Sequence, residues 1–91
     1  MILDNIHNHY ENLVYEEVRR RLAAEEGADF SSHALEDVAC LALNHLPARY
    51  VRHSVDIAFY LTPKERADMD QQVRDAVAAA FDLVMKHPHR D

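Results

Sequence analysis

Apolar residues recur at steps of three and four positions in three parts of the chain, which is the spacing of helices with one buried face. The first part predicts a helix near residues 4–24, capped by Asp4 or Asn5. Its apolar face comprises Leu3, Ile6, Tyr10, Leu13, Val14, Val18 and Leu22. The second part predicts a helix near residues 34–46, capped by Ser31 or Ser32. Its apolar face comprises Val38, Ala39, Ala42, Leu43 and Leu46.

The third part predicts a last helix over residues 63–86. Thr62 suits the cap, Pro63 the first helical position, and Glu65 completes a capping box with Thr62. The apolar stripe of this helix comprises Met69, Val73, Ala76, Val77, Ala80, Phe81 and Val84. Residues 76–85 are apolar around most of the circumference, so this helix should be buried on more than one side. In so short a chain, we expect the additional side to contact a second subunit.

A proline separates the second helix from the segment that follows it. Pro47 has no backbone N–H and disfavours helical geometry at Leu46, so the helix should end there. Residues 49–60 contain no breaker and are rich in β-branched and aromatic residues, which predicts at most a short strand. Arg49, Tyr50 and Arg52 lie at its start. Two interpretations stay open, a recognition element for an anion and an ordinary connection with solvated arginines.

The remaining charged residues of the first helix have a simple explanation. Glu16 with Arg20, and Glu17 with Arg21, are spaced for ion pairs on a solvated helix face. The run 19–21 consists of three arginines, for which a solvated face is the usual role and anion binding the alternative. Gly27, the only glycine, stands where a helix C-cap is expected.

Composition narrows the class of protein. The 91 residues predict a single domain over positions 1–91, and 48% hydrophobic residues are too many for a disordered chain. The net charge of −6 argues against direct DNA binding, which needs a basic surface. The N-terminus does not resemble a signal peptide, and no apolar run is long enough to span a membrane. We therefore expect a soluble cytoplasmic protein without membrane contact.

No set of residues indicates catalysis, and we do not expect an enzyme. The single cysteine excludes an intrachain disulfide, and the apolar surroundings of Cys40 predict a buried structural thiol. The seven histidines lack the spacing of a structural metal site, so no metal is expected. Asp37 and Asp56 are candidate salt-bridge partners for the arginines.

The second helix and its exit carry a recognisable motif. Residues 37–51 read Asp-Val-Ala-Cys-Leu-Ala-Leu-Asn-His-Leu-Pro-Ala-Arg-Tyr-Val. This resembles the pattern Asp-x-x-Ala-Leu-Ala-Leu-Asn-x-Leu-Pro-Pro-Arg/Lys-Tyr-Val of the late-competence ComFB family. The likeness extends from the opening run at Asn8 through the Thr62 cap to Pro88. Ala48 replaces the usual second proline. Ser31 and Ala34 stand where family members often carry a cysteine pair, so the zinc that the pair implies is not carried over.

The resemblance implies a homodimeric, mainly α protein of three to four helices with at most a short strand. It also implies a receptor for a cyclic dinucleotide, cyclic di-GMP or cyclic di-AMP, that acts on an unidentified downstream protein and needs no cofactor. Two arginines and a tyrosine suit such a ligand, which carries two phosphates and two flat purines. The expected ligand-binding residues are Arg49, Tyr50, Arg52, Asn44, Asp37, His53 and Lys64. A helical protein-interaction adaptor in competence or pilus regulation, without a nucleotide ligand, is the alternative.

The motif also leads to expectations about individual side chains. Arg49 and Arg52 are three positions apart, so on an extended segment they project to opposite sides. We expect Arg49 to contact a phosphate and Tyr50 to point toward the core. Asn44 and Asp37 lie near a helix end, where such side chains often satisfy loop backbone groups. Replacing either should therefore harm folding at least as much as binding.

Overall fold

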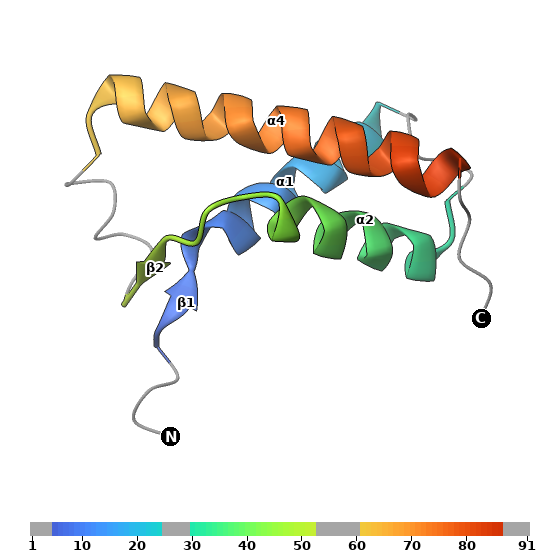
Figure 1. Ribbon diagram of the computed structural model, residues 1–91, viewed down its shortest axis with the longest axis horizontal. Coiled ribbons are helices and arrows are strands. Elements are labelled where there is room, and N and C mark those ends of the chain that lie inside the picture. The colour runs from blue at the N-terminus through green and yellow to red at the C-terminus, as the bar shows by residue number, and fades with distance from the viewer. Residues whose placement is uncertain (1–4, 25–29, 53–60, 87–91) are drawn as a thin grey trace.

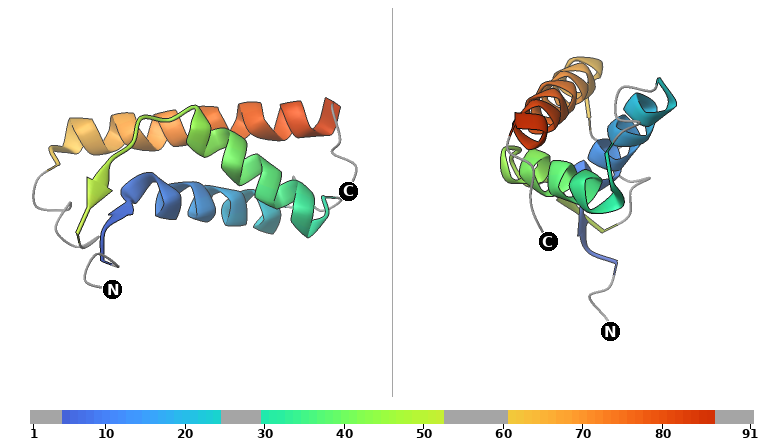
Figure 2. Two further views of the ribbon diagram at one scale, coloured as in Figure 1. Left: turned by 60° about the horizontal axis from the view of Figure 1, so that its bottom comes forward. Right: turned by 90° about the vertical axis from the view of Figure 1, so that its right-hand side faces the viewer.

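The computed structural model describes residues 5–24, 30–52 and 61–86. In chain order these contain β1 (His7–Asn8), α1 (His9–Ala23), α2 (Ser32–Asn44), β2 (Tyr50–Val51) and α4 (Pro63–Lys86). The helices pack against one another around a common core: α1 and α4 run in the same general direction, α2 runs in the opposite direction, and each helix contacts the other two (Figures 1 and 2). The predicted mainly α architecture with a short strand is confirmed.

The core is built from most of the predicted apolar positions, but Ile6, predicted on the face of the first helix, precedes α1 and is 51% exposed. The largest fully buried side chains are Val14 on α1, Val38 on α2 and Val77 on α4. The stripe of α4 is confirmed, since its members are buried along the helix: Met69, Val73, Val77, Ala80, Phe81 and Val84. None of the helices in the described part of the chain combines the length and apolar character that a membrane span requires.

The α4 helix begins where its local sequence requires. Its predicted bounds are confirmed, and the capping box is formed by two reciprocal hydrogen bonds. The backbone N–H of Glu65 donates to Thr62 Oγ1 over 3.1 Å, and the N–H of Thr62 donates to Glu65 Oε1 over 3.2 Å. The cap of α2 is Ser31, whose side chain accepts from the N–H of Ala34.

The start of α1 differs from its predicted position. The helix begins at His9, not near residue 4, and Asn8 provides the cap by accepting from the N–H of Tyr10. Residues 7 and 8 form a strand instead, because His7 pairs with Val51 and Asn8 with Tyr50 in an antiparallel register. The helix ends at Ala23, while Gly27, the expected C-cap, lies outside the described residues.

The predicted solvated face of α1 is wrong at Glu17. Its side chain is only 8% exposed and binds two arginines, with Arg20 Nη2 at 2.7 Å and Arg21 Nε at 3.0 Å from Oε2. The hydrogen bonds from Arg20 are the largest cause that lowers the pKa of Glu17, while burial opposes them. Arg20 hydrogen-bonds Glu17 through Nε and Nη2 over 2.9 and 2.7 Å, and the expected pair of Glu17 with Arg21 is confirmed. Two of the three consecutive arginines thus stabilise the helix, and Arg21 also stacks on the Phe81 ring at 5.8 Å.

Candidate functional site

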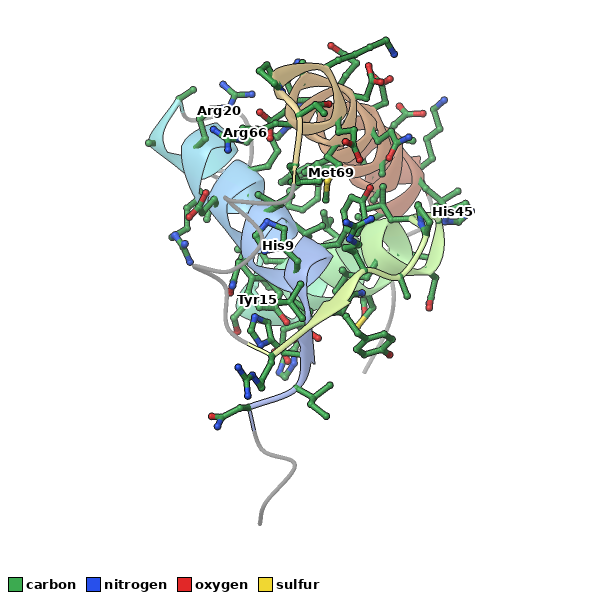
Figure 3. All side chains as sticks on the ribbon, turned by 90° about the vertical axis from the view of Figure 1, so that its left-hand side faces the viewer. His9, Tyr15, Arg20, His45, Arg66 and Met69 are labelled. Carbon is green, nitrogen blue, oxygen red and sulfur yellow. The ribbon has the colours of Figure 1, made fainter. Side chains whose placement is uncertain are left out.

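Three chain segments meet at one end of the molecule, where the candidate site lies. The start of α1, the exit from α2 and the start of α4 come together beside the β1–β2 pair (Figure 1). Figure 3 views the molecule from this end, with His9 on α1 and Met69 on the inner side of α4. The segment 47–52 carries the arginines that the sequence singles out.

The backbone of this segment is fixed by α1. The N–H of Arg49 donates to Asn8 Oδ1 over 2.9 Å, and the N–H of His9 donates to the carbonyl of Arg49 over 2.7 Å. The same Asn8 oxygen caps α1. One side chain therefore both starts the helix and holds the exit of α2 against it. We call these contacts of Asn8 and His9 with Arg49 the clamp.

The clamp presents Arg49, Tyr50 and Arg52 to solvent. All three side chains are exposed, and neither arginine forms an ion pair with another described residue. Tyr50 is 68% exposed, so the expectation that it points toward the core is wrong. Tyr50 lies in β2, which pairs only with β1 among the described residues. The interpretation of solvated arginines and that of an anion site both fit this exposure.

The other predicted site residues are more dispersed. Asn44 is exposed and Asp37 half-buried on α2, and neither hydrogen-bonds another residue in the described ranges. We expected these two side chains to hydrogen-bond the loop backbone, and within the described ranges this is wrong. Asn8 makes such a bond instead, by accepting from the N–H of Arg49. Lys64 begins α4, where it is exposed and pairs with Asp68 over 2.9 Å. His53 lies outside the described residues, as do residues 54–60 of the expected extended run.

A hollow of about 270 Å³ adjoins the clamp. One wall is the segment Pro47–Arg49, and the other is the first half of α4 with Glu65, Asp68 and Met69. Tyr10, which is buried and donates to Gln72 Oε1 over 2.8 Å, lies at the junction with α1. Burial raises the pKa of the Tyr10 hydroxyl, and the positive charge of Arg49 acts against this rise. We call this space the clamp hollow.

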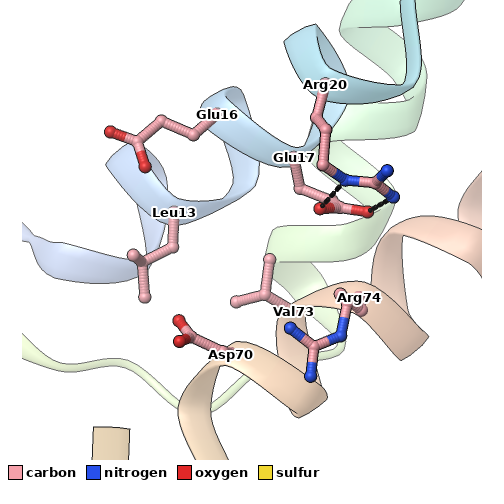
Figure 4. A pocket seen from close by; sticks show the side chains of 7 residues that line it. All are labelled: Leu13, Glu16, Glu17, Arg20, Asp70, Val73 and Arg74. Carbon is pink, nitrogen blue, oxygen red and sulfur yellow. Dashed lines mark hydrogen bonds and ion pairs between the residues drawn. The ribbon is translucent and has the colours of Figure 1, made fainter. Parts of the chain in front are cut away.

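A second hollow, of about 180 Å³, lies between α1 and α4 (Figure 4). Figure 4 shows Glu17 and Arg20 joined by hydrogen bonds of 2.9 and 2.7 Å on its rim. Its lining mixes both charges over an apolar floor: Leu13, Glu16, Glu17, Arg20, Asp70, Val73 and Arg74.

The described histidines, carboxylates and the single cysteine are dispersed over the structure. Within ranges 5–24, 30–52 and 61–86, no three His, Cys, Asp or Glu side chains gather in the manner of a metal site. Cys40 is exposed on the outer side of α2, so the expected buried thiol is wrong. The apolar neighbours of Cys40 in sequence face the core, whereas position 40 falls on the opposite side of the helix.

We predict that removing the clamp side chain destabilises the protein. Asn8→Ala should lower the free energy of unfolding by about 1–3 kcal/mol, because it removes a helix cap and a hydrogen bond to Arg49. Asn8→Asp keeps an acceptor at the helix start and should recover most of this loss. Urea unfolding of the three proteins measures the effect. Equal stability of the aspartate and alanine variants would argue against a capping role.

The imidazole ring of His9 should make the stability of the protein depend on pH. Its Nδ1 is buried and has no hydrogen-bond partner among the described residues. Burial is the main cause that lowers the pKa of His9. His7 and Arg49 lower it further, and Glu16 and Asp70 act in the opposite direction. The unfolded chain therefore binds a proton at higher pH than the folded protein.

We predict the direction of the pH dependence from this shift. The contribution of neutral His9 is fully present above its unfolded pKa of 6.5 and is lost as the pH falls through the lower folded value. His9→Gln should therefore lose less stability than the parent between pH 7.5 and pH 5. Unfolding free energies at both pH values test this. An identical pH slope in both proteins would exclude His9 as the cause.

The arrangement defines a small helical protein with an exposed basic-aromatic segment whose backbone is fixed by α1. A family model described as late competence development protein ComFB matches residues 7–88. The chain therefore belongs to the ComFB family, as its motif indicates. Comparisons with curated proteins and with solved structures found no match.

Several residues of this site are not evident from the motif alone. Asn8 and His9 belong to the opening run that resembles the family's first helix, but nothing local indicates that they contact position 49. Asp68 and Glu65 look like ordinary residues of the first turns of a helix. The signal that could have found Asn8 is its type, since asparagine is a preferred cap.

Proposed function

We propose that this protein is a homodimeric, non-enzymatic receptor for a cyclic dinucleotide, which binds at Arg49, Tyr50 and Arg52. The observation that carries the proposal is the clamp, which fixes the backbone of Arg49 while its guanidinium stays exposed and unpaired among the described residues. Family membership adds to this support.

The chemistry of the segment suits the ligand. A guanidinium offers forked donors that match a phosphodiester, and it is held here without a competing carboxylate. The exposed ring of Tyr50 offers a flat surface on which a purine can stack. Because the clamp orders the backbone before binding, less conformational entropy is lost when the ligand arrives.

Dimerisation is part of the proposal. The C-terminal half of α4 leaves Leu83 44% exposed and Met85 62% exposed, although Val77, Ala80, Phe81 and Val84 of the same half are buried in the core. A second copy would cover this apolar surface. A two-fold dimer would also present the arginines twice, which matches the two-fold symmetry of a cyclic dinucleotide.

The adaptor alternative rests on the same exposed apolar residues, which a different protein could cover instead. A buried Arg49 paired with Asp37 would have favoured the adaptor. Arg49 is exposed and does not pair with Asp37, so the receptor is the better supported of the two.

Calorimetric titration with cyclic di-GMP and cyclic di-AMP tests the proposal, with GMP and AMP as monomeric controls. We expect saturable binding of at least one cyclic dinucleotide and much weaker binding of the monomers. Light scattering on the same samples should give twice the mass of the chain. The absence of saturable binding of both cyclic ligands by the folded protein would overturn the receptor, and a monomeric mass at micromolar concentration would overturn the dimer.

A further inference from the structure

The clamp hollow is too small for a whole cyclic dinucleotide. Its volume of about 270 Å³ lies just below the roughly 300–1,000 Å³ of pockets that enclose drug-sized molecules. A cyclic dinucleotide has two nucleotide units, so only one flat part of it fits. Tyr10 and Met69 are both buried and supply an apolar floor against which a ring can lie.

The polar wall of this hollow accepts hydrogen bonds and repels anions. Glu65 and Asp68 line it from α4, and ionised carboxylates are acceptors only. Each uses one oxygen locally, Glu65 Oε1 for the N–H of Thr62 and Asp68 Oδ2 for Lys64. The second oxygen of each has no hydrogen bond to another described residue. Beside these two carboxylates a phosphate is thus disfavoured and a group rich in N–H donors is favoured, whereas Arg49 lines the opposite wall.

Of the two purines, guanine matches this wall. The Watson–Crick edge of guanine carries two adjacent donors, the ring N1–H and the exocyclic N2 amino group. Adenine carries one amino group beside an acceptor nitrogen, which would face a carboxylate oxygen unfavourably. Arg49, on the opposite wall, would contact a phosphate of the bound cyclic dinucleotide. The carboxylates therefore suit the base, and the guanidinium suits the phosphate.

We propose that the clamp hollow holds a guanine base, and that Glu65 and Asp68 select guanine over adenine. This inference rests on the proposed function and deepens it, because it names cyclic di-GMP as the preferred ligand and two specificity-determining residues on α4. Neither residue belongs to the basic-aromatic segment.

Two conservative variants test the selection. Asp68→Asn keeps the size of the side chain but replaces one acceptor oxygen with a donor. Glu65→Gln does the same and preserves the capping box, since glutamine also serves at that position. The matched control is Asp75→Asn, an exposed aspartate on the same helix that hydrogen-bonds Gln71 and does not line the hollow.

The quantity to measure is the ratio of the dissociation constants for cyclic di-AMP and cyclic di-GMP. Because it is a ratio, general effects of freeing Lys64 from Asp68 cancel. We expect the parent to prefer cyclic di-GMP at least tenfold, the order that one well-placed pair of hydrogen bonds contributes. Asp68→Asn or Glu65→Gln should reduce this ratio about tenfold, and Asp75→Asn should leave it unchanged.

The outcomes separate this inference from the proposed function. A parent that binds both cyclic dinucleotides equally, or variants that keep the parental ratio, would overturn guanine selection and leave the receptor intact. A parent that binds neither ligand would overturn both. The ratio of dissociation constants is also measured on the parent protein alone. The inference can therefore be tested even if a variant fails to fold.

Discussion

Replacing Phe81 with alanine is expected to lower the free energy of unfolding by about 3–5 kcal/mol, the usual cost of truncating a buried aromatic side chain. Phe81 is 7% exposed, its ring centroid lies 5.1 Å from that of Phe30, and the Arg21 guanidinium stacks on it. The variant would lose both contacts and leave a cavity between α1 and α4. Since small domains are stable by only about 5–15 kcal/mol, a large fraction of the stability would be lost.

The matched control is Tyr15→Ala, which truncates an aromatic side chain that is 41% exposed on α1. It should cost about 1 kcal/mol or less, in keeping with a surface substitution. Urea unfolding of the parent and both variants gives the comparison. If Phe81→Ala cost no more than Tyr15→Ala, the core would not be organised around α4 as described.

The second large effect concerns ligand affinity. Arg49→Ala should weaken binding of the preferred cyclic dinucleotide about ten- to a hundredfold, because it removes a charge-assisted hydrogen bond worth roughly 1.5–3 kcal/mol. Arg49→Lys should recover only part of this, since an ammonium group cannot make the forked contact. Calorimetry of the three proteins measures the differences.

Arg19→Ala is the control for charge alone, because Arg19 is exposed in the second half of α1, away from the clamp. It should change affinity less than threefold. Unchanged binding by folded, dimeric Arg49→Ala and Arg49→Lys would refute the phosphate role of Arg49. Arg52 would then be the next residue to replace.

The sequence predicts α4 fully because its signals are local. Thr62, Pro63 and Glu65 lie within one helical turn, and the apolar stripe repeats along the same helix. The start of α1 is missed for the opposite reason. Asn8 caps the helix and binds the backbone 41 positions away, and no local pattern encodes a contact of that range.

Burial of single polar or aromatic side chains is similarly hard to predict. Glu17 has the spacing of a solvated ion pair, yet it is buried because two arginines approach it at once. Cys40 has apolar neighbours in sequence and Tyr50 is aromatic, yet both are exposed, since exposure depends on which elements cover each face. The basic-aromatic segment itself is evident from the sequence. The α4 residues that face this segment across the clamp hollow can be identified only from the packed structure.

The most direct test of the central claim follows backbone amide chemical shifts of the protein during titration with cyclic di-GMP. If the clamped segment binds the phosphates, the largest changes should fall on the amides of His9, Arg49, Tyr50 and Arg52, with smaller ones at the start of α4. Saturable changes confined to the outer side of α2, around Glu36 and Cys40, would contradict the account, as would the absence of any change at the clamp.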